Sequence, residues 1–298
     1  MTDLRGWIQD GQVRVVDGAM GTLLYERGVF LNACYDQLNL TQPERVTEIH
    51  REYVDAGAEL LTTNTFGANP VKLSGFDLMA ETEEINCAAG RLANGVGGEG
   101  VKVFGAMGPL GVSVESRGIL SRDQARELFR RQVRGLIDGG VLGFVLETFS
   151  RPEEIRCAMD AVRSESDLPI FAQITYQAPP PPDGAVEKLV ESLEAWGADV
   201  IGANCSPGPA HLLDVIERMA QATDLPLVAQ PGAMRPHVVG DRTMDQVSPQ
   251  HMAGYASRMV EAGVQFIGGC CGTTPTHIRA IREAVVDRSG KRNARAAE

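Results

Sequence analysis

The chain has 298 residues, of which 43% are hydrophobic and 22% are charged, as in a globular domain with a sizeable core. Its net charge of −11 argues against a nucleic-acid surface, because phosphate neutralisation needs clustered Lys and Arg. No apolar run approaches the ~20 residues of a membrane span, and residues 1–12 lack the pattern of a signal peptide, so we expect a cytoplasmic protein.

Eight short apolar runs recur along the chain, each rich in β-branched and aliphatic residues and with little alternation. Parallel strands that are covered by helices on both faces of their sheet have this composition. In chain order, the predicted strands are 13–19, 59–66, 101–107, 143–149, 169–176, 199–205, 225–230 and 265–271.

Helical patterns lie between these strands. Residues 43–55 follow Thr41, the predicted cap, residues 121–138 begin at Ser121, and residues 276–286 follow Pro275. A similar four-residue pattern that contains glycine precedes four of the strands, at 55–58, 138–141, 195–198 and 261–264. In each case the glycine can end a helix in the left-handed conformation and lead directly into the strand.

Eight strands that alternate with about eight helices over ~250 residues predict an α/β fold, a single-domain (β/α)8 TIM barrel. A doubly wound open sheet is the alternative architecture. The barrel core is expected at about 13–286 without an internal linker, and the proline-rich segment 177–184 is predicted to be a stiff loop. The polar C-terminal tail, at about 287–298, is expected to be disordered.

Three thiols lie at the carboxyl ends of predicted strands, where TIM barrels place their active sites. Cys205 ends the sixth strand, and Cys270 and Cys271 end the eighth. Three thiolates with an open fourth position are a ligand set for catalytic zinc. Adjacent strand residues point to opposite faces, so this pair can share an ion only if the strand breaks, which the flanking glycines allow. Buried structural thiols or a vicinal disulfide are the alternatives, because no CxxC repeat is present.

The remaining cysteines and histidines are not expected to bind metal. Cys87 and Cys157 fall among apolar neighbours on predicted helices, where cysteine acts as a small hydrophobic residue, and Cys34 lies in a loop. The five histidines lack the spacing of metal ligands. Four of them are expected on helix surfaces, namely His50, His211, His251 and His277.

Polar residues at other strand ends are candidates for binding a small substrate. The loop Asp17-Gly18-Ala19-Met20-Gly21 can direct backbone N–H groups at a carboxylate or phosphate, or it can be a tight turn without a ligand. Glu147 ends an apolar strand, where a carboxylate needs a partner such as a substrate ammonium, a lysine or a backbone amide. Asn204 can orient the substrate or cap the following turn.

Six motifs occur in order along the predicted core. They are Val-Asp-Gly-Ala-Met-Gly-Thr at 16–22, Leu-Thr-Thr-Asn-Thr-Phe-Gly-Ala at 61–68, Gly-Pro-Leu-Gly at 108–111, Glu-Thr-Phe-Ser at 147–150, Gly-Ala-Asn-Cys-Ser at 202–206 and Gly-Gly-Cys-Cys-Gly-Thr-Thr-Pro at 268–275. This series resembles the homocysteine S-methyltransferase family. It is most similar to the homocysteine-binding barrel of cobalamin-dependent methionine synthase.

The resemblance implies transfer of a methyl group to the thiol of L-homocysteine, giving methionine, at a zinc ion held by Cys205, Cys270 and Cys271. It also implies that the amides after Asp17 hold the amino-acid carboxylate and that Glu147 meets the ammonium. Zinc deprotonates a bound thiol, whose free pKa is ~8.5, and the thiolate attacks an activated methyl group.

No motif identifies the methyl donor. It is either a small sulfonium such as S-methylmethionine, or methylcobalamin on a separate protein, or methylcobalamin on another domain of a longer enzyme. Pro-Gly-Ala-Met at 231–234 replaces the usual Pro-Asn-x-Gly, and 177–184 also departs from the family pattern. Betaine-using members have a tyrosine where this chain has Thr148. His237, after the seventh strand, is a weak candidate for donor contact.

Two other classes of function remain as alternatives. One is a non-catalytic zinc-thiolate module that docks a corrinoid or folate partner. The other is a barrel lyase or aldolase that binds a phosphorylated substrate. An aldolase of this kind would need a Schiff-base lysine at a strand end, and no predicted strand ends in one.

Overall fold

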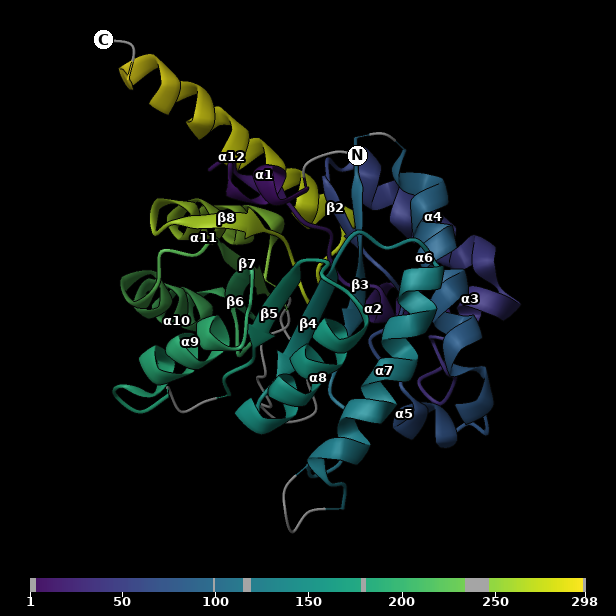
Figure 1. Cartoon of the computed structure of the whole chain (residues 1–298). Helices are drawn as coiled ribbons and strands as arrows, with labels where there is room; N and C mark the ends of the chain where they lie inside the picture. Colours follow the sequence, from purple (N-terminus) through teal and green to yellow (C-terminus); the bar gives the residue numbers. More distant parts are fainter. Residues whose placement is uncertain (1–3, 99, 115–118, 178–180, 234–246, 297–298) are drawn as a thin grey trace, which may run out of the picture.

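Eight parallel strands form the centre of the computed structural model, which describes residues 4–98, 100–114, 119–177, 181–233 and 247–296 (Figure 1). Each strand overlaps one of the apolar runs predicted from the sequence. The strands are β1 (Arg14–Val15), β2 (Leu60–Thr62), β3 (Lys102–Met107), β4 (Phe144–Phe149), β5 (Ile170–Ile174), β6 (Val200–Cys205), β7 (Leu227–Pro231) and β8 (Val264–Ile267).

The sheet closes on itself. Its hydrogen-bonded order is β1-β8-β7-β6-β5-β4-β3-β2, and a parallel bridge between Val16 and Leu60 joins the two ends. The amide of Asp17 donates to the carbonyl of Leu60 at 3.0 Å, and the amide of Glu59 donates to the carbonyl of Val15 at 2.7 Å. The predicted TIM barrel is confirmed, and the open sheet is wrong.

Helices surround the barrel, as expected where parallel strands are linked by crossover connections. They are α1 (Leu4–Gln9), α2 (Gly21–Glu26), α3 (Leu38–Thr41), α4 (Pro43–Asp55), α5 (Pro70–Ser74), the 3-10 turn η1 (Met79–Glu81), α6 (Thr82–Gly97), α7 (Arg122–Asp138), α8 (Pro152–Glu165), α9 (Ala185–Ala195), α10 (Pro209–Ala222), α11 (Pro249–Glu261) and α12 (Pro275–Ala296).

Two predicted helix caps have different outcomes. Ser121 accepts a hydrogen bond from the amide of Gln124, whose side chain bonds back, so α7 begins with a capping box. Thr41 does not cap α4, because it is the last residue of α3 and its hydroxyl donates to the carbonyl of Gln37. Gln42, at φ −145°, separates the two helices.

The four glycine joints behave as predicted. Gly57, Gly140, Gly197 and Gly263 have φ angles of 98°, 80°, 88° and 110°, in the region that favours glycine. Each ends a helix and leads into β2, β4, β6 or β8. The repeated four-residue pattern therefore corresponds to a repeated helix-to-strand connection.

The barrel interior changes from apolar to polar along its axis. At the amino end, Phe104, Phe171 and Phe266 pack edge to face, and Ile8 of α1 lies in the same buried cluster. Two residues further along β5, Gln173 donates to the side-chain oxygen of Gln230 of β7 at 2.6 Å. The carboxyl end of the barrel is therefore the end with polar chemistry.

The C-terminal segment continues as helix α12 to Ala296, which extends away from the barrel in Figure 1. The predicted disorder of residues 287–298 stays a prediction. Ile278 and Ile281, near the start of this helix, are fully buried. Within the described residues, no helix is both long and apolar enough to cross a membrane.

Candidate active site

Three thiols converge at the carboxyl end of the barrel. The sulfur atoms of Cys205, Cys270 and Cys271 all lie within 4.8 Å of one another. Cys205 Sγ is 2.7 Å from Cys270 Sγ and 3.5 Å from Cys271 Sγ. In the described part of the chain, no other group of three or more His, Cys, Asp or Glu side chains is close enough to share an ion. This cluster can hold a metal.

The segment after the eighth strand brings both adjacent cysteines to the cluster. β8 ends at Ile267, but the amides of Gly268 and Cys270 still donate to the carbonyls of Ala229 and Pro231 of β7, at 3.1 and 2.9 Å. The chain turns at Gly272, which has a φ of 77°. A Cβ atom on Gly268 would lie 2.6 Å from the carbonyl oxygen of Asp17, and one on Gly269 would lie 2.4 Å from Thr273 Oγ1. Glycine is therefore required at these two positions, and the chain leaves the regular strand after Cys270.

The backbone around the other thiol is strained. Cys205 and Ser206 have φ angles of 56° and 57°, a left-handed conformation that costs a non-glycine residue free energy. Residues after β7 hold this turn, because the amide of Gly232 donates to the carbonyl of Cys205 at 3.2 Å. The amide of Ala233 donates to the carbonyl of Cys271 at 2.8 Å. The segment 231–233 therefore joins the two cysteine segments through its backbone.

Protons are shared unequally among the three thiols. Hydrogen bonding with Cys205 and Cys271, together with burial, raises the pKa of Cys270 well above its ordinary value. Hydrogen bonds from Cys205 and Cys270 lower the pKa of Cys271 to about 3. In the absence of a metal, the cluster therefore favours a single thiolate that the other two thiols stabilise through hydrogen bonds. Deprotonation of all three requires a cation, and thiolate sulfur suits a soft tetrahedral ion.

Glu147, near the end of β4, lies in electrostatic range of this cluster. Burial raises the pKa of its carboxyl group to about 8, with further contributions from the charges of Asp17 and Cys271. Lys72 of α5 opposes the shift. The site thus disfavours an ionised carboxylate until a cation arrives, and a substrate ammonium is such a cation.

The side chain of Asp17 is hydrogen-bonded to the next strand, and burial raises the pKa of its carboxyl group to about 7. Asp17 is 2% exposed, and its oxygens accept hydrogen bonds from the amide of Thr62 at 2.7 Å and the hydroxyl of Thr62 at 3.0 Å. The amide of Ala19 donates to Thr273 Oγ1 at 3.1 Å. Within the predicted anion loop, the amides that follow, at Met20 and Gly21, lie at the start of α2.

Three residues that support this loop were missed from the sequence. Tyr53 of α4 donates from its hydroxyl to the carbonyl of Ala19 at 2.7 Å, and Thr62 and Thr273 make the contacts described above. A Cβ atom on Gly18 would lie 2.6 Å from Thr273 Oγ1, so glycine is required there. Thr62 and Thr273 fall inside two of the six sequence motifs, whereas Tyr53 has only the signature of a core residue.

The other cysteines and histidines lie outside the thiol cluster. Cys157 is buried on α8, Cys87 lies on α6, and Cys34 lies in a loop, as predicted. The prediction of surface histidines is wrong for two residues, because His50 is fully buried on α4 and His277 is 3% exposed. The ring of His277 is fixed between Thr274 and the carbonyl of Val247. Helical periodicity alone did not show which face of each helix packs inward.

Several predictions lie outside the described residues. They include His237 and the end of the 231–235 segment. In the 177–184 loop, residues 178–180 are outside as well.

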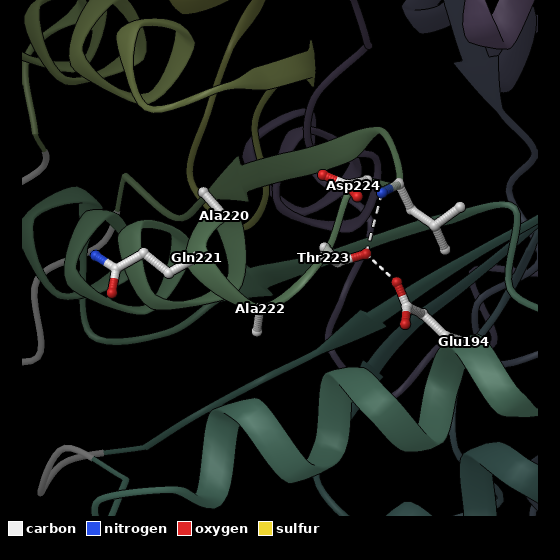
Figure 2. Close-up of a pocket in the computed structure, with 7 residues that line it drawn as sticks. Glu194, Ala220, Gln221, Ala222, Thr223 and Asp224 are labelled. Carbon is white, nitrogen blue, oxygen red and sulfur yellow. Dashed lines mark hydrogen bonds between the residues drawn. The ribbon is translucent and has the colours of Figure 1, made fainter.

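A separate pocket lies away from the thiols. Figure 2 shows its lining, which comes from the end of α9, the end of α10 and the approach to β7: Glu194, Ala220, Gln221, Ala222, Thr223, Asp224 and Leu225. Thr223 hydrogen bonds to Glu194 and accepts from the amide of Leu225 at 3.0 Å. The pocket precedes β7, so it is at the amino end of the barrel, opposite the candidate active site.

Comparison with known proteins agrees with the motifs and the thiol cluster. The sequence pattern of the family described as homocysteine S-methyltransferase matches residues 14–285. The chain belongs to the homocysteine S-methyltransferase family. Methionine synthases of Mycobacterium tuberculosis (strain H37Rv) and Mycobacterium leprae are each 29% identical, over 93% and 92% of this chain. The chain spans only 25% and 24% of their lengths.

Solved structures support the fold. The homocysteine methyltransferase MmuM of Escherichia coli, in its oxidized form, has a TM-score of 0.79 at 23% identity, over 94% of this chain and 99% of that one. Its metallated form has a TM-score of 0.77 at 23% identity, with the same coverage of both chains. At these sequence identities, the structural similarity shows that the two proteins have the same barrel fold.

Proposed function

We propose that this barrel binds L-homocysteine and transfers a methyl group to its thiol, giving methionine, with zinc as the metal. The main observation in support is that Cys205, Cys270 and Cys271 place their sulfur atoms within 4.8 Å of one another at the carboxyl end of the barrel. Membership of the homocysteine S-methyltransferase family supports the same substrate.

The chain offers a group for each part of an amino-acid substrate. Glu147 binds the ammonium, which lowers the pKa of its carboxyl group from the raised value of about 8 and makes the contact charge-assisted. The amides of Met20 and Gly21, at the start of α2, bind the carboxylate. The substrate side chain then extends towards the three cysteines.

Zinc, held by Cys205, Cys270 and Cys271, would keep the homocysteine sulfur deprotonated and nucleophilic near neutral pH. The thiol proton leaves to solvent. The sulfur attacks the methyl carbon of the donor, and the bond between that carbon and the donor breaks with its electron pair remaining on the donor. Glu147 and the α2 amides fix the amino acid, so that its sulfur is aligned for this displacement.

A methyl-transfer assay on homocysteine tests the proposal. Zinc-loaded protein is incubated with L-homocysteine and, in parallel, with methylcobalamin or S-methylmethionine, and methionine is measured. We expect methionine with at least one donor. Zinc binding without homocysteine binding by calorimetry would instead support a non-catalytic zinc-thiolate module.

A further inference from the structure

Asn204 connects the two halves of the candidate active site. It lies one residue before Cys205 in β6 and is fully buried. Its side-chain oxygen accepts from the amide of Thr148 at 2.8 Å. Its side-chain nitrogen lies 2.8 Å from Thr148 Oγ1, 3.4 Å from Glu147 Oε2 and 3.6 Å from Cys270 Sγ. One amide group therefore contacts both the Glu147 carboxylate and a thiol of the cluster.

The hydrogen-bonding capacity of Asn204 is used within the protein. An asparagine side chain has two N–H donors, and here three acceptors from Glu147, Thr148 and Cys270 share them. No donor is left for direct substrate contact. The substrate-binding role predicted from the sequence is therefore better described as indirect.

The residue that Asn204 holds most tightly is strained. Thr148 has a φ of 63°, which is a genuine outlier for a β-branched residue. Asn204 bonds both to its amide and to its hydroxyl, at 2.8 Å each. This clamp maintains the turn that immediately follows Glu147 and so sets the direction of the carboxylate.

We propose that Asn204 is a positioning residue whose N–H groups anchor Glu147 and Cys270 together, so that the amino-acid pocket and the metal site reinforce each other. An ion on Cys270 fixes the sulfur and orients the amide that contacts it. The oriented amide holds Glu147 in place before the amino acid arrives, so less ordering remains to be done on binding. This inference rests on the proposed function in taking the thiol cluster to hold zinc and the neighbouring site to accept an amino acid.

Two binding measurements on the full chain test the coupling without any methyl transfer. L-2-Aminobutyrate, which is homocysteine without its sulfur, is titrated by calorimetry into zinc-loaded and zinc-free protein. Zinc retention is measured by competition with a chelator. We expect the wild-type protein to bind the analogue more tightly when zinc is present. Equal affinities with and without zinc would overturn the inference.

Asn204→Asp separates the donor role from the backbone clamp. It keeps the oxygen that accepts from Thr148 but replaces the N–H donors with an anion beside Glu147 and Cys270. We expect zinc to bind about 10–100-fold more weakly, as for lost contacts around metal ligands, and the effect of zinc on analogue affinity to disappear. Wild-type values for both measurements would mean that Asn204 only clamps the backbone, and would overturn the inference.

Two further variants complete the design. Asn86→Asp is the matched control, since Asn86 is equally buried but donates to the carbonyls of Ala68 and Thr82, and it should leave zinc retention unchanged. If Asn204→Asp does not fold, Thr148→Ala provides the test. It frees an N–H of Asn204 for the other two acceptors, so zinc retention should equal or exceed that of wild type, and a loss would overturn the inference.

These outcomes are distinguishable from failure of the proposed function. If wild-type protein binds zinc but neither homocysteine nor the analogue, the proposed substrate is wrong. If it binds both and Asn204→Asp behaves as wild type, the substrate stands and only the coupling is wrong.

Discussion

Two carboxylates near the thiol cluster have different surroundings and therefore different roles. The oxygens of Asp17 accept two hydrogen bonds from Thr62, which tie the loop after β1 to β2. Glu147 contacts the side-chain nitrogen of Asn204 at 3.4 Å, and burial raises the pKa of its carboxyl group to about 8. Burial also raises the pKa of Asp17, to about 7, so the raised pKa alone does not separate the two residues. The hydrogen bonds from Thr62 do, because they stabilise the charge of Asp17 within the protein, whereas Glu147 has more to gain from a cationic ligand.

The thiol cluster leads to the first prediction, which concerns metal content. Cys205→Ser, Cys270→Ser and Cys271→Ser should each release zinc from a protein that otherwise holds about one ion per chain, because a hydroxyl is a poor substitute for a thiolate ligand. Metal analysis of the purified variants checks this.

Cys87→Ser and Cys157→Ser are the controls for that experiment, since both residues lie on helices outside the cluster, and they should retain zinc. Full zinc in Cys271→Ser would remove this residue from the ligand set.

The second prediction concerns the ammonium contact. Glu147→Gln should weaken homocysteine binding by about 1–3 kcal/mol, the range for a lost charge-assisted hydrogen bond, while zinc content stays the same. Calorimetry on zinc-loaded protein measures this. Wild-type affinity in the variant would return Glu147 to a purely structural role.

The raised pKa of Glu147 predicts a pH dependence with a definite sign. A carboxyl group with a pKa of about 8 is mainly protonated at lower pH and must lose its proton before it pairs with an ammonium. Affinity for L-2-aminobutyrate, which has no thiol to titrate, should therefore rise between about pH 6 and pH 7.5. In Glu147→Gln this rise should be absent, and a matching rise in the variant would assign it to another group.

At the scale of elements, the close approach of β6 and β7 limits which residues can precede the first cysteine. A Cβ atom on Gly202 would lie 1.8 Å from the carbonyl oxygen of Val228, which is backbone and cannot rotate away. The two strands pair from Ile201 opposite Leu227 to Cys205 opposite Pro231. A side chain at position 202 would push β6 and β7 apart, and this displacement would be transmitted along β6 to Cys205.

The third prediction follows from this contact. Gly202→Ala should destabilise the protein by about 1–3 kcal/mol through overpacking and should also weaken zinc retention. Thermal unfolding with and without a chelator measures both effects. Gly254→Ala is the matched control, because Gly254 is exposed in α11 with open space around its Cα, and alanine there should be neutral or stabilising. Unchanged stability in Gly202→Ala would show that the strand pair relaxes freely.

At the scale of the whole molecule, the methyl donor must approach the sulfur from the carboxyl end of the barrel. Arg218 of α10 donates to the carbonyls of Pro181 and Pro182 at 3.1 Å each, so this end of the 177–184 loop is anchored to a helix. A segment that is held in this way loses little entropy when a partner docks on it. We propose that this surface suits a large donor that docks, such as a corrinoid domain or protein.

The fourth prediction compares the two donor classes. Free methylcobalamin should act as a slow surrogate donor, because it lacks the protein that would orient it, and S-methylmethionine should react poorly or not at all. Parallel rates of methionine formation with zinc-loaded protein check this. Efficient turnover with S-methylmethionine and none with methylcobalamin would reverse the donor assignment without changing the homocysteine site.

Features with a local physical cause could be predicted from the sequence. Strands covered on both faces are apolar throughout, and the four left-handed joints need glycine, so the eight strands and their connections were correct. The sequence also indicated that adjacent cysteines can face one ion only where the regular strand has ended, and the chain turns at Gly272, directly after the pair. Thr41 failed as a cap since an unexpected short helix, α3, ends there.

Features that depend on contacts across the barrel could not be predicted from the sequence. His50 and His277 were expected on the surface, but the packing of α4 and α12 buries them. The hydrogen bonds of Asp17 with Thr62 join residues 45 positions apart, and those of Asn204 with Glu147 join residues 57 positions apart. No local pattern encodes such pairs, because they form only when the barrel closes.

The chain by itself therefore determined which chemical groups reach the carboxyl end of the barrel, since strand length and glycine position are local properties. Only the tertiary structure decided which of those groups bond to other parts of the protein and which can meet a ligand. It directs the side chain of Asp17 to the scaffold, leaves Glu147 with an elevated pKa, and places Asn204 between the carboxylate and the thiols. Burial and charge proximity depend on distances between strands, which only the closed barrel defines.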